Sequence, residues 1–315
     1  MWTIIVQVFP YAVAFTIPLL ITALGGLYSE RSGIVNIGLE GLMVVGFFTG
    51  ALVISKLELS IPGISIWLGL LAAFIAGALF SLLHAFACIS LNANQVISGT
   101  AINMIAGALT VFLARNMTGS GNILIVHGLI RRDVPVLSDI PVVGKLFFTQ
   151  VYATTWLVLV LLAVSWFILY RTAFGLRLRA CGEHPQAADS AGINVYKMRY
   201  IAVMVSGAFA GLGGAIILVT YSGEFTGTVS GLGFLALAAL IFGQWKPLGV
   251  LGATLFFGFA STIANVSQVI PALSGIPGIL LKNFPYIVTL AVLVLSSKYS
   301  QAPRAAGEPY DKAKR

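Results

Sequence analysis

A polar stretch at residues 29–41, SERSGIVNIGLEG, joins two long apolar segments almost without a loop. Within it Asn36 and Glu40 are four residues apart, a spacing that puts two side chains on one face of a helix. A carboxylate inside a membrane-spanning segment is costly and normally faces a cavity or a polar partner. We therefore expect this face to line a path for a polar solute across a membrane.

A second interpretation of Glu40 stays open. The carboxylate could instead lie near the membrane interface and bond backbone groups or Arg31. Ser32 can serve as the N-cap of the helix that follows, because its hydroxyl can accept a bond from a free backbone N–H. Asn103 lies in the fourth apolar segment, where an unpaired amide would be unfavourable in lipid. Asn36, Glu40 and Asn103 are thus the expected path residues.

The second polar stretch, residues 175–192, reads GLRLRACGEHPQAADSAG. Pro185 can open a short helix and Gly192 can end it. Three alanines would give this helix a side of small apolar residues: Ala187, Ala188 and Ala191. A short helix with little side-chain bulk suits docking in a groove of another protein. A plain basic loop would explain the arginines but not the helix.

The sequence offers no sign of catalysis. It contains no P-loop motif G-x-x-x-x-G-K-[ST], so it cannot bind ATP by that route. Its two cysteines lie far apart, its three histidines form no motif, and no nucleophile–base arrangement is recognisable. We expect a chain that is not an enzyme, binds no metal or cofactor itself, and takes its energy from a partner or an ion gradient.

The composition requires these stretches to be held by membrane helices. Of the 315 residues, 58% are hydrophobic and 9% are charged, and the mean hydropathy is +0.98. A soluble protein needs roughly a quarter of its residues charged. Apolar runs of about 20 residues, enough to cross a hydrocarbon core of about 30 Å, recur along the chain. The expected fold class is an all-α, polytopic membrane helical bundle.

We expect about nine or ten membrane helices in a single transmembrane domain, residues 1–300. Nine segments can be placed, at residues 4–27, 34–54, 64–91, 96–114, 153–170, 200–222, 229–243, 247–264 and 284–297. The runs 229–243 and 284–297 are short for a full crossing. The polar segment 115–150 is expected to be a loop outside the bilayer.

Lys and Arg residues indicate the orientation. The connection 171–199, the expected coupling loop, and the segment 298–315, which includes a tail at 301–315, are both rich in basic residues. Cytoplasmic loops carry such an excess, so both are expected in the cytoplasm. Counting back puts segment 115–150 and the N-terminus outside, although that segment carries four basic residues. The net charge of +8 fits this bias rather than nucleic acid.

A faint internal repeat relates two apolar segments. Residues 68–81, LGLLAAFIAGALFS, match residues 248–261, LGVLGATLFFGFAS. With the expected topology the two halves would be inverted repeats, an arrangement common in transporters with a central site. The alternative is chance, because Leu, Gly and Ala dominate the composition.

Together the motifs SERSGIVNIGLEG and GLRLRACGEHPQAADSAGI resemble the permease subunits of bacterial ABC importers. The resemblance is to the branch that serves nucleosides, related to the ribose and branched-chain amino acid permeases, and it covers nearly the whole chain. The SERSG start departs from the ribose-type pattern, which favours a nucleoside over a pentose.

The resemblance implies a multi-pass protein of the bacterial plasma membrane that works with other subunits. These would be a second permease, related or identical, a cytoplasmic ATPase that binds ATP and Mg²⁺, and an extracellular substrate-binding lipoprotein. Contacts with membrane lipid and none with nucleic acid are expected. The segment 183–192 would match the helix that couples the permease to the ATPase. The implied coupling residues are Glu183, Pro185, Ala188 and Gly192.

Three other functions remain as alternatives. The chain could be an ABC permease for a simple sugar or another small solute. It could be an ion-coupled secondary transporter, with Glu40 as the coupling group. A membrane-embedded enzyme is disfavoured, because the polar catalytic cluster that such chemistry needs is not recognisable in the sequence.

Overall fold

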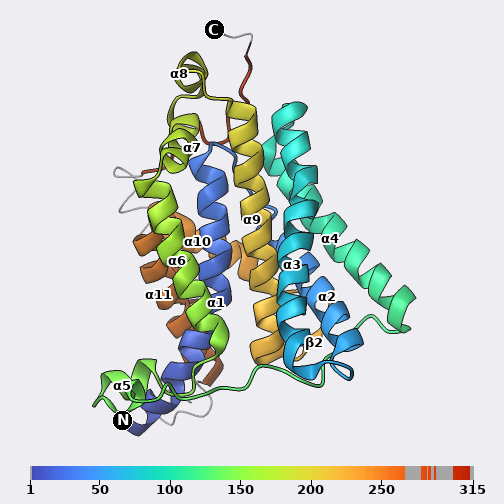
Figure 1. The fold of residues 1–315 in the computed structure, drawn as a ribbon, viewed down its shortest axis with the longest axis vertical. Coiled ribbons are helices and arrows are strands. Elements are labelled where there is room, and N and C mark those ends of the chain that lie inside the picture. The colour runs from blue at the N-terminus through green and yellow to red at the C-terminus, as the bar shows by residue number, and fades with distance from the viewer. Residues whose placement is uncertain (1, 267–277, 282, 285–286, 289–300, 313–315) are drawn as a thin grey trace.

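The protein folds as a bundle of long helices in the computed structural model, which describes residues 2–266, 278–281, 283–284, 287–288 and 301–312 (Figure 1). The α-helices are α1 (Trp2–Arg31), α2 (Leu39–Leu57), α3 (Pro62–Ala85), α4 (Gln95–Thr118), α5 (Val143–Phe147), α6 (Ala153–Arg171), α7 (Ala173–Glu183), α8 (Pro185–Ser190), α9 (Val195–Ile217), α10 (Leu232–Phe242) and α11 (Pro247–Val266). The π-helical turns η1 (Phe86–Ser90) and η3 (Leu218–Ser222) extend α3 and α9, and η2 (Leu137–Asp139) is a 3₁₀ turn. Strand β1 (Ile123–Leu124) pairs antiparallel with β2 (Glu224–Phe225).

The helical membrane bundle predicted from composition is confirmed. Within the described residues, seven helices are long and apolar enough to cross a bilayer, and α10 is a shorter apolar helix. The expected short run 229–243 corresponds to α10. The ninth expected segment, 284–297, lies mostly outside the described residues. Helix α5 and the β1–β2 pair were not expected within or beside the polar loop.

The connection between α1 and α2 differs from the prediction. Helix α1 continues to Arg31, and α2 begins only at Leu39 rather than at residue 34. Ser32 therefore does not cap α2, and that prediction is wrong. Its hydroxyl instead donates to the Ser29 carbonyl at 2.7 Å and closes the last turn of α1. The seven residues between the helices run back into the bundle.

Helix α9 forms the centre of the bundle and packs on α1, α2 and α3. Small residues permit this close packing, which in lipid replaces the hydrophobic effect as the force between helices. A Cβ atom built on Gly46 of α2 would lie 2.0 Å from the Gly211 carbonyl oxygen of α9, so neither helix could keep its position with a larger residue there.

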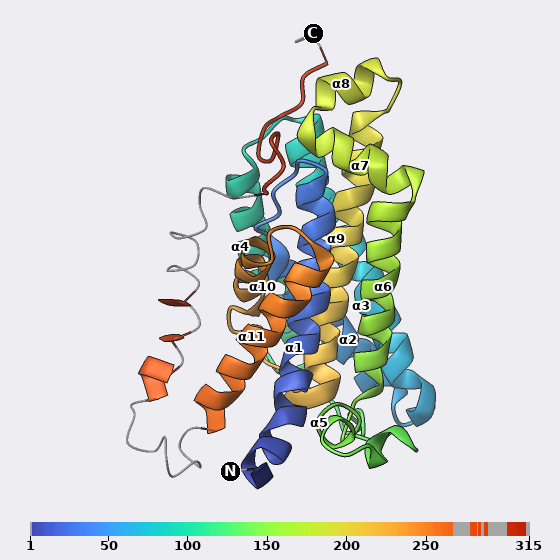
Figure 2. The same ribbon diagram turned by 90° about the vertical axis from the view of Figure 1, so that its left-hand side faces the viewer.

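The two ends of the bundle carry different elements. The N-terminus, α5 and the β1–β2 pair lie at one end, and α7, α8 and the C-terminal residues lie at the other (Figures 1 and 2). This separation agrees with the expected topology, in which the loop 115–150 lies opposite the loop 171–199 and the tail. The basic residues of the second end make it the predicted cytoplasmic side.

The two segments of the expected repeat lie in α3 and α11. Helix α3 ends near Ile34, because Ala85 and Ile34 belong to one buried cluster at the end of α1. Helix α11 starts at that same end, two residues after Trp245, which contacts the last turn of α1. The two helices thus run in opposite directions, as an inverted repeat requires. The repeat itself stays a prediction.

Candidate functional site

The predicted coupling segment, residues 173–193, forms two successive short helices at one end of the bundle. Helix α7 ends at Glu183, and Pro185 is the first residue of α8, where its missing N–H costs nothing. The N–H of Gly192 donates to Asp189 O at 2.9 Å, and that of Ile193 donates to Ala188 O at 3.0 Å. With φ of +81° at Gly192, this is a Schellman C-cap. The expected helix between Pro185 and Gly192 is confirmed.

The side of α8 that faces away from the protein differs from the expected one. Pro185 and Ala188 are buried against this chain, and Ala188 is only 4% exposed. Gln186, Ala187 and Ala191 are exposed instead. The coupling role of the segment stays a prediction, but Ala188 cannot supply the outer contact surface, because its side chain packs inward.

The thiol of Cys181, in α7, is buried beside this segment. Burial raises the pKa of the Cys181 thiol to about 11, although the positive charge of Arg199 acts in the opposite direction. The thiol is therefore protonated at neutral pH. It acts as a small apolar side chain between α7 and the bundle.

Asn36 is fully buried in the connection before α2. Its side-chain oxygen accepts from the Gly38 N–H at 3.1 Å, and its amide nitrogen donates to Ser206 Oγ of α9 at 2.9 Å. The prediction that Asn36 and Glu40 share one face of a helix is wrong, because Asn36 precedes the helix that carries Glu40. Asn36 ties the returning chain to the central helix.

Glu40 binds the beginning of another helix. Its two carboxylate oxygens accept from the N–H groups of Gly231, at 2.8 Å, and Gly233, at 2.7 Å. Gly231 is the N-cap of α10 and Gly233 lies in its first turn, where backbone N–H groups have no partner within their own helix. The partial positive charge of a helix N-terminus also favours a carboxylate. The second interpretation of Glu40 included bonds to backbone groups, and the structure shows such bonds.

Asn103 reaches from α4 to the same region. Its side-chain oxygen accepts from the Gly41 N–H at 2.7 Å, and its amide donates to Ile37 O at 3.0 Å. Asn103 therefore holds the beginning of α2, as Asn36 does from the other side. None of the three expected path residues is among the described residues that line the cavity between α1, α2, η3, α10 and α11.

A cavity of about 450 Å³ lies between α1, α2, η3, α10 and α11. Its described lining is Phe15, Phe47, Ile217, Tyr221, Ser222, Thr226, Thr228, Val229, Ser230, Leu232, Leu235, Ser261, Ala264, Asn265 and Asn283. The volume lies within the range of about 300–1,000 Å³ that is usual for small-molecule sites. These lining residues include no charged side chain.

The cavity wall combines aromatic and polar groups. The rings of Phe15 and Tyr221 stack, with centroids 5.7 Å apart and planes at 21°. Hydroxyl groups come mainly from the segment between η3 and α10, and Asn265 on α11 adds an amide. Such a wall offers a π-face together with neutral donors and acceptors, which suits a flat, uncharged, hydroxylated solute.

The cavity and the coupling segment lie toward opposite ends of the bundle. Phe15 precedes Arg31 by sixteen residues of α1, a distance of roughly 24 Å at about 1.5 Å per residue. Arg31 in turn lies beside Glu183, at the end of α7. Helix α10 spans the space between, since its first turn lines the cavity and its last residue, Phe242, precedes the turn that contacts α1.

The cavity was not predicted from the sequence. One signal was available: residues 221–231, YSGEFTGTVSG, form a stretch rich in hydroxyl groups between two apolar helices. The stacking of Phe15 on Tyr221 could not be inferred, because the two residues are far apart in the chain and come together only through packing.

Comparison with known proteins assigns the class of this bundle. Residues 9–297 match the family model described as "Branched-chain amino acid transport system / permease component". The chain belongs to this permease family. The match covers nearly every helix of the bundle, including the cavity, the coupling segment and the connection that holds Asn36.

Relatives within the family carry more specific names. The chain is 50% identical to the guanosine ABC transporter permease protein NupQ of Bacillus subtilis (strain 168), over 97% of both chains. It is 43% identical to the nucleoside ABC transporter permease protein NupC of Lactococcus lactis subsp. cremoris (strain MG1363), over 95% of both chains. Identity to a second B. subtilis permease, the guanosine ABC transporter permease protein NupP, is 27% over 90% of this chain and 79% of NupP.

Proposed function

We propose that this chain is a transmembrane permease subunit of an ABC importer that carries nucleosides into the cell. The observation that supports this most strongly is the identity of 50% and 43%, over nearly full length, to permeases named for guanosine and nucleosides. The cavity, whose described lining carries no charged side chain, supports the same cargo with its aromatic pair and hydroxyl groups.

In this proposal the cavity is the part of the path that receives the nucleoside. A nucleobase packs on the exposed faces of Phe15 and Tyr221, and the ribose hydroxyls exchange hydrogen bonds with the hydroxyl and amide groups of the wall. Such contacts are individually weak. That suits a channel, because tight binding would slow release.

Glu40, Asn36 and Asn103 act in this proposal as supports of the path rather than as contacts of the cargo. They fix the beginnings of α2 and α10 through bonds to backbone groups. Both helices line the cavity with side chains one or two turns further along, Phe47 on α2 and Leu235 on α10. Loss of a support would therefore change the shape of the cavity.

The energy comes from a partner subunit. ATP and Mg²⁺ bind a separate cytoplasmic ATPase, and the exposed side of α8, with Ala187 and Ala191, contacts it. Pro185, Ala188 and Gly192 shape this surface from within, and Glu183 holds its base. Transport follows from a shift between two states of the permease that the ATPase binds differently when it holds ATP.

The assembly in this proposal contains a second, related permease. B. subtilis has two guanosine permeases among the relatives, NupQ and NupP, and this chain is 50% identical to the first and 27% identical to the second. We therefore expect a heterodimer in which this chain takes the position of NupQ. An extracellular substrate-binding lipoprotein completes the importer.

Reconstitution tests the proposed function. The chain is co-expressed with the second permease, the ATPase and the binding lipoprotein, and the complex is placed in proteoliposomes with labelled guanosine on the lipoprotein side. Uptake that requires ATP on the other side supports the proposal. Uptake that persists without the ATPase and stops when an ion gradient is collapsed would indicate a secondary transporter. ATP-dependent uptake of a simple sugar alone would leave only the ABC permease assignment.

A further inference from the structure

Residues 301–310, which we name the C-terminal strap, lie across the end of the bundle that carries α7 and α8 (Figure 2). Their sequence, QAPRAAGEPY, has the polar composition of a free tail. Three of its side chains are nevertheless buried: Pro303, and Ala305 and Tyr310, which are each 4% exposed. The strap is therefore a packed part of the permease.

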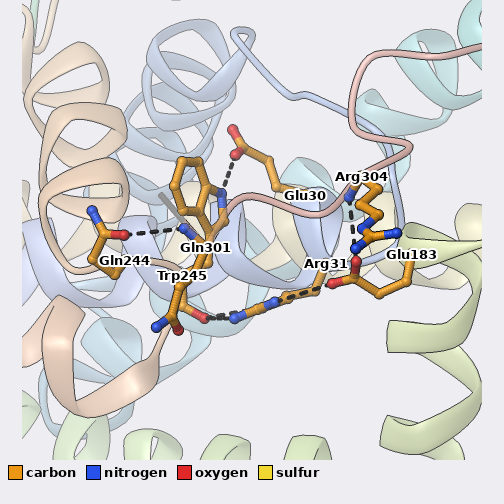
Figure 3. A network of polar contacts seen from close by, with 7 residues as sticks. All are labelled: Glu30, Arg31, Glu183, Gln244, Trp245, Gln301 and Arg304. Atoms are coloured by element: carbon orange, nitrogen blue, oxygen red, sulfur yellow. Dashed lines mark hydrogen bonds and ion pairs between the residues drawn. The ribbon is translucent and has the colours of Figure 1, made fainter. Parts of the chain in front are cut away.

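The first half of the strap joins two distant elements through its backbone. The Gln301 N–H donates to Gln244 Oε1, in the turn between α10 and α11, at 3.1 Å. The Arg304 N–H donates to Glu183 Oε2 at 3.4 Å (Figure 3). The next residue, Ala305, donates its N–H to Gly182 O at 2.9 Å. The strap thus connects the α10–α11 turn to the end of α7.

The second half of the strap is anchored on α9. Arg199 is 1% exposed, and its guanidinium donates to Ser32 O at 3.1 Å and to Glu308 O at 3.2 Å. The Tyr310 ring packs on the Tyr196 ring, with centroids 5.4 Å apart. A buried cation needs partners of this kind, and Ser32 O lies at the negative end of the α1 macrodipole.

A parallel connection runs through the last turn of α1 (Figure 3). Arg31 donates to Trp245 O at 3.0 and 2.7 Å and lies 3.8 Å from the Glu183 carboxylate. The neighbouring Glu30 accepts from the indole N–H of Trp245. Trp245 and Gln244 have φ of +52° and +53°, a conformation that residues other than glycine rarely adopt without support. The α10–α11 turn is therefore held in place by its neighbours.

We infer that the C-terminal strap is a positioning element for transport: it fixes the coupling segment α7–α8 to the α10–α11 turn, so that movement imposed by the ATPase reaches α10 and the cavity. The inference rests on the proposed function for the direction of the signal. It goes beyond that function by assigning a role to residues 301–310. Without the strap, among the polar contacts described above, only those of Arg31 would link a side chain of α7 to the turn directly, and its contact with the partly exposed Glu183 is long.

The test compares ATP use with transport in the reconstituted importer. One variant ends at residue 300 and lacks the strap, and its matched control ends at Lys312 and keeps every strap contact described above. We expect the ATP hydrolysed per nucleoside imported to rise at least about fivefold in the first variant, the lower end of the usual range for coupling between two sites. It should stay unchanged in the control. An unchanged ratio in the shorter variant would overturn the inference.

If the shorter chain does not insert into the membrane, a second pair of variants, both of full length, tests the same inference. Tyr310→Ala removes the ring from Tyr196 and Arg199, whereas Tyr310→Phe keeps it. The ratio should rise with Ala and not with Phe. A merely structural role would lower uptake and ATP hydrolysis together and leave the ratio as in the wild type, which would also overturn the inference.

A cross-linking measurement tests the strap contact without any transport, so its outcome does not depend on the proposed function. Cysteines at Gln244→Cys and Gln301→Cys should be joined by a short bismaleimide in the assembled complex, with each single variant as a control. Absence of the cross-link would overturn the strap contact itself. Should the wild type import a solute other than a nucleoside, the proposed cargo fails, and the ATP ratio is then measured with that solute.

Discussion

Glu40 Oε1 accepts a hydrogen bond of 2.8 Å from the backbone N–H of Gly231, 191 residues further along the chain. The carboxylate stands in the first turn of α2 and serves as the N-terminal cap of α10, which begins within the bundle. One side chain thus fixes two helix beginnings beside the cavity. The proposed supporting role of Glu40, Asn36 and Asn103 depends on this geometry.

Replacement of Glu40 should lower stability in a graded way. Glu40→Leu leaves the N–H groups of Gly231 and Gly233 without a partner, at a cost of roughly 1–3 kcal/mol each. Glu40→Gln keeps one oxygen as acceptor and should lose about half as much. Thermal unfolding of the purified complex in detergent measures this order. A Glu40→Gln protein with wild-type stability but no uptake would instead indicate a coupling carboxylate, as in a secondary transporter.

Tyr221 should matter for the passage of the cargo through its ring rather than its hydroxyl. Tyr221→Ala should lower guanosine uptake, at saturating binding lipoprotein, by about tenfold, because stacking of a base on an aromatic side chain is worth about 1–3 kcal/mol. Tyr221→Phe keeps the ring and should retain most of the uptake. Equal loss in both variants would assign the effect to the hydroxyl, and no loss in either would remove Tyr221 from the path.

Two neighbouring alanines of α8 should respond differently to the same substitution. Ala187 is exposed, so Ala187→Arg should leave stability unchanged and abolish the stimulation of ATP hydrolysis by the loaded binding lipoprotein. Ala188 is 4% exposed, so Ala188→Arg should bury an unpaired charge and lower the unfolding temperature. Normal stimulation in the Ala187→Arg complex would exclude this side of α8 from the contact with the ATPase.

Cys181 should react slowly with alkylating reagents in the folded protein. With its pKa raised to about 11, about one thiol in a thousand is ionised at pH 8, against roughly a quarter for a thiol with a pKa of about 8.5. Because only the thiolate reacts, labelling should speed up about tenfold per pH unit up to about pH 11. The Cys88→Ser background isolates the signal, and Gln186→Cys supplies an exposed thiol for comparison. Rapid labelling of Cys181 at pH 8 would contradict its burial.

Local signals in the sequence predicted local structure well. Pro185 and Gly192 fix the ends of α8 through their own backbone preferences, so that helix could be predicted from its residues alone. Ser32 misled because a serine closes the last turn of one helix as readily as it caps the next, and only the path of the chain decides between them. The lengths of the apolar runs predicted the membrane helical bundle but not the residue at which α2 begins.

Contacts between distant residues could not be predicted in the same way. The bond of Glu40 to Gly231 and that of Gln301 to Gln244 involve backbone groups, which every residue carries. The residue types at positions 231 and 301 therefore do not indicate that their backbone N–H groups make such bonds. The strap was expected to be a tail, because its polar composition gives no indication that Ala305 and Tyr310 are buried. Each of these contacts depends on the packing of the whole bundle.

The identity of the cargo is the central claim, and competition in the reconstituted importer tests it most directly. ATP-driven uptake of labelled guanosine is measured with an excess of unlabelled guanosine, guanosine monophosphate or ribose. The described residues that line the cavity include no basic side chain to balance a phosphate, so a nucleotide would enter without a counter-charge. We predict that guanosine competes and that the monophosphate and ribose do not. Competition by the monophosphate with its intact entry, or competition by ribose alone, would contradict the account.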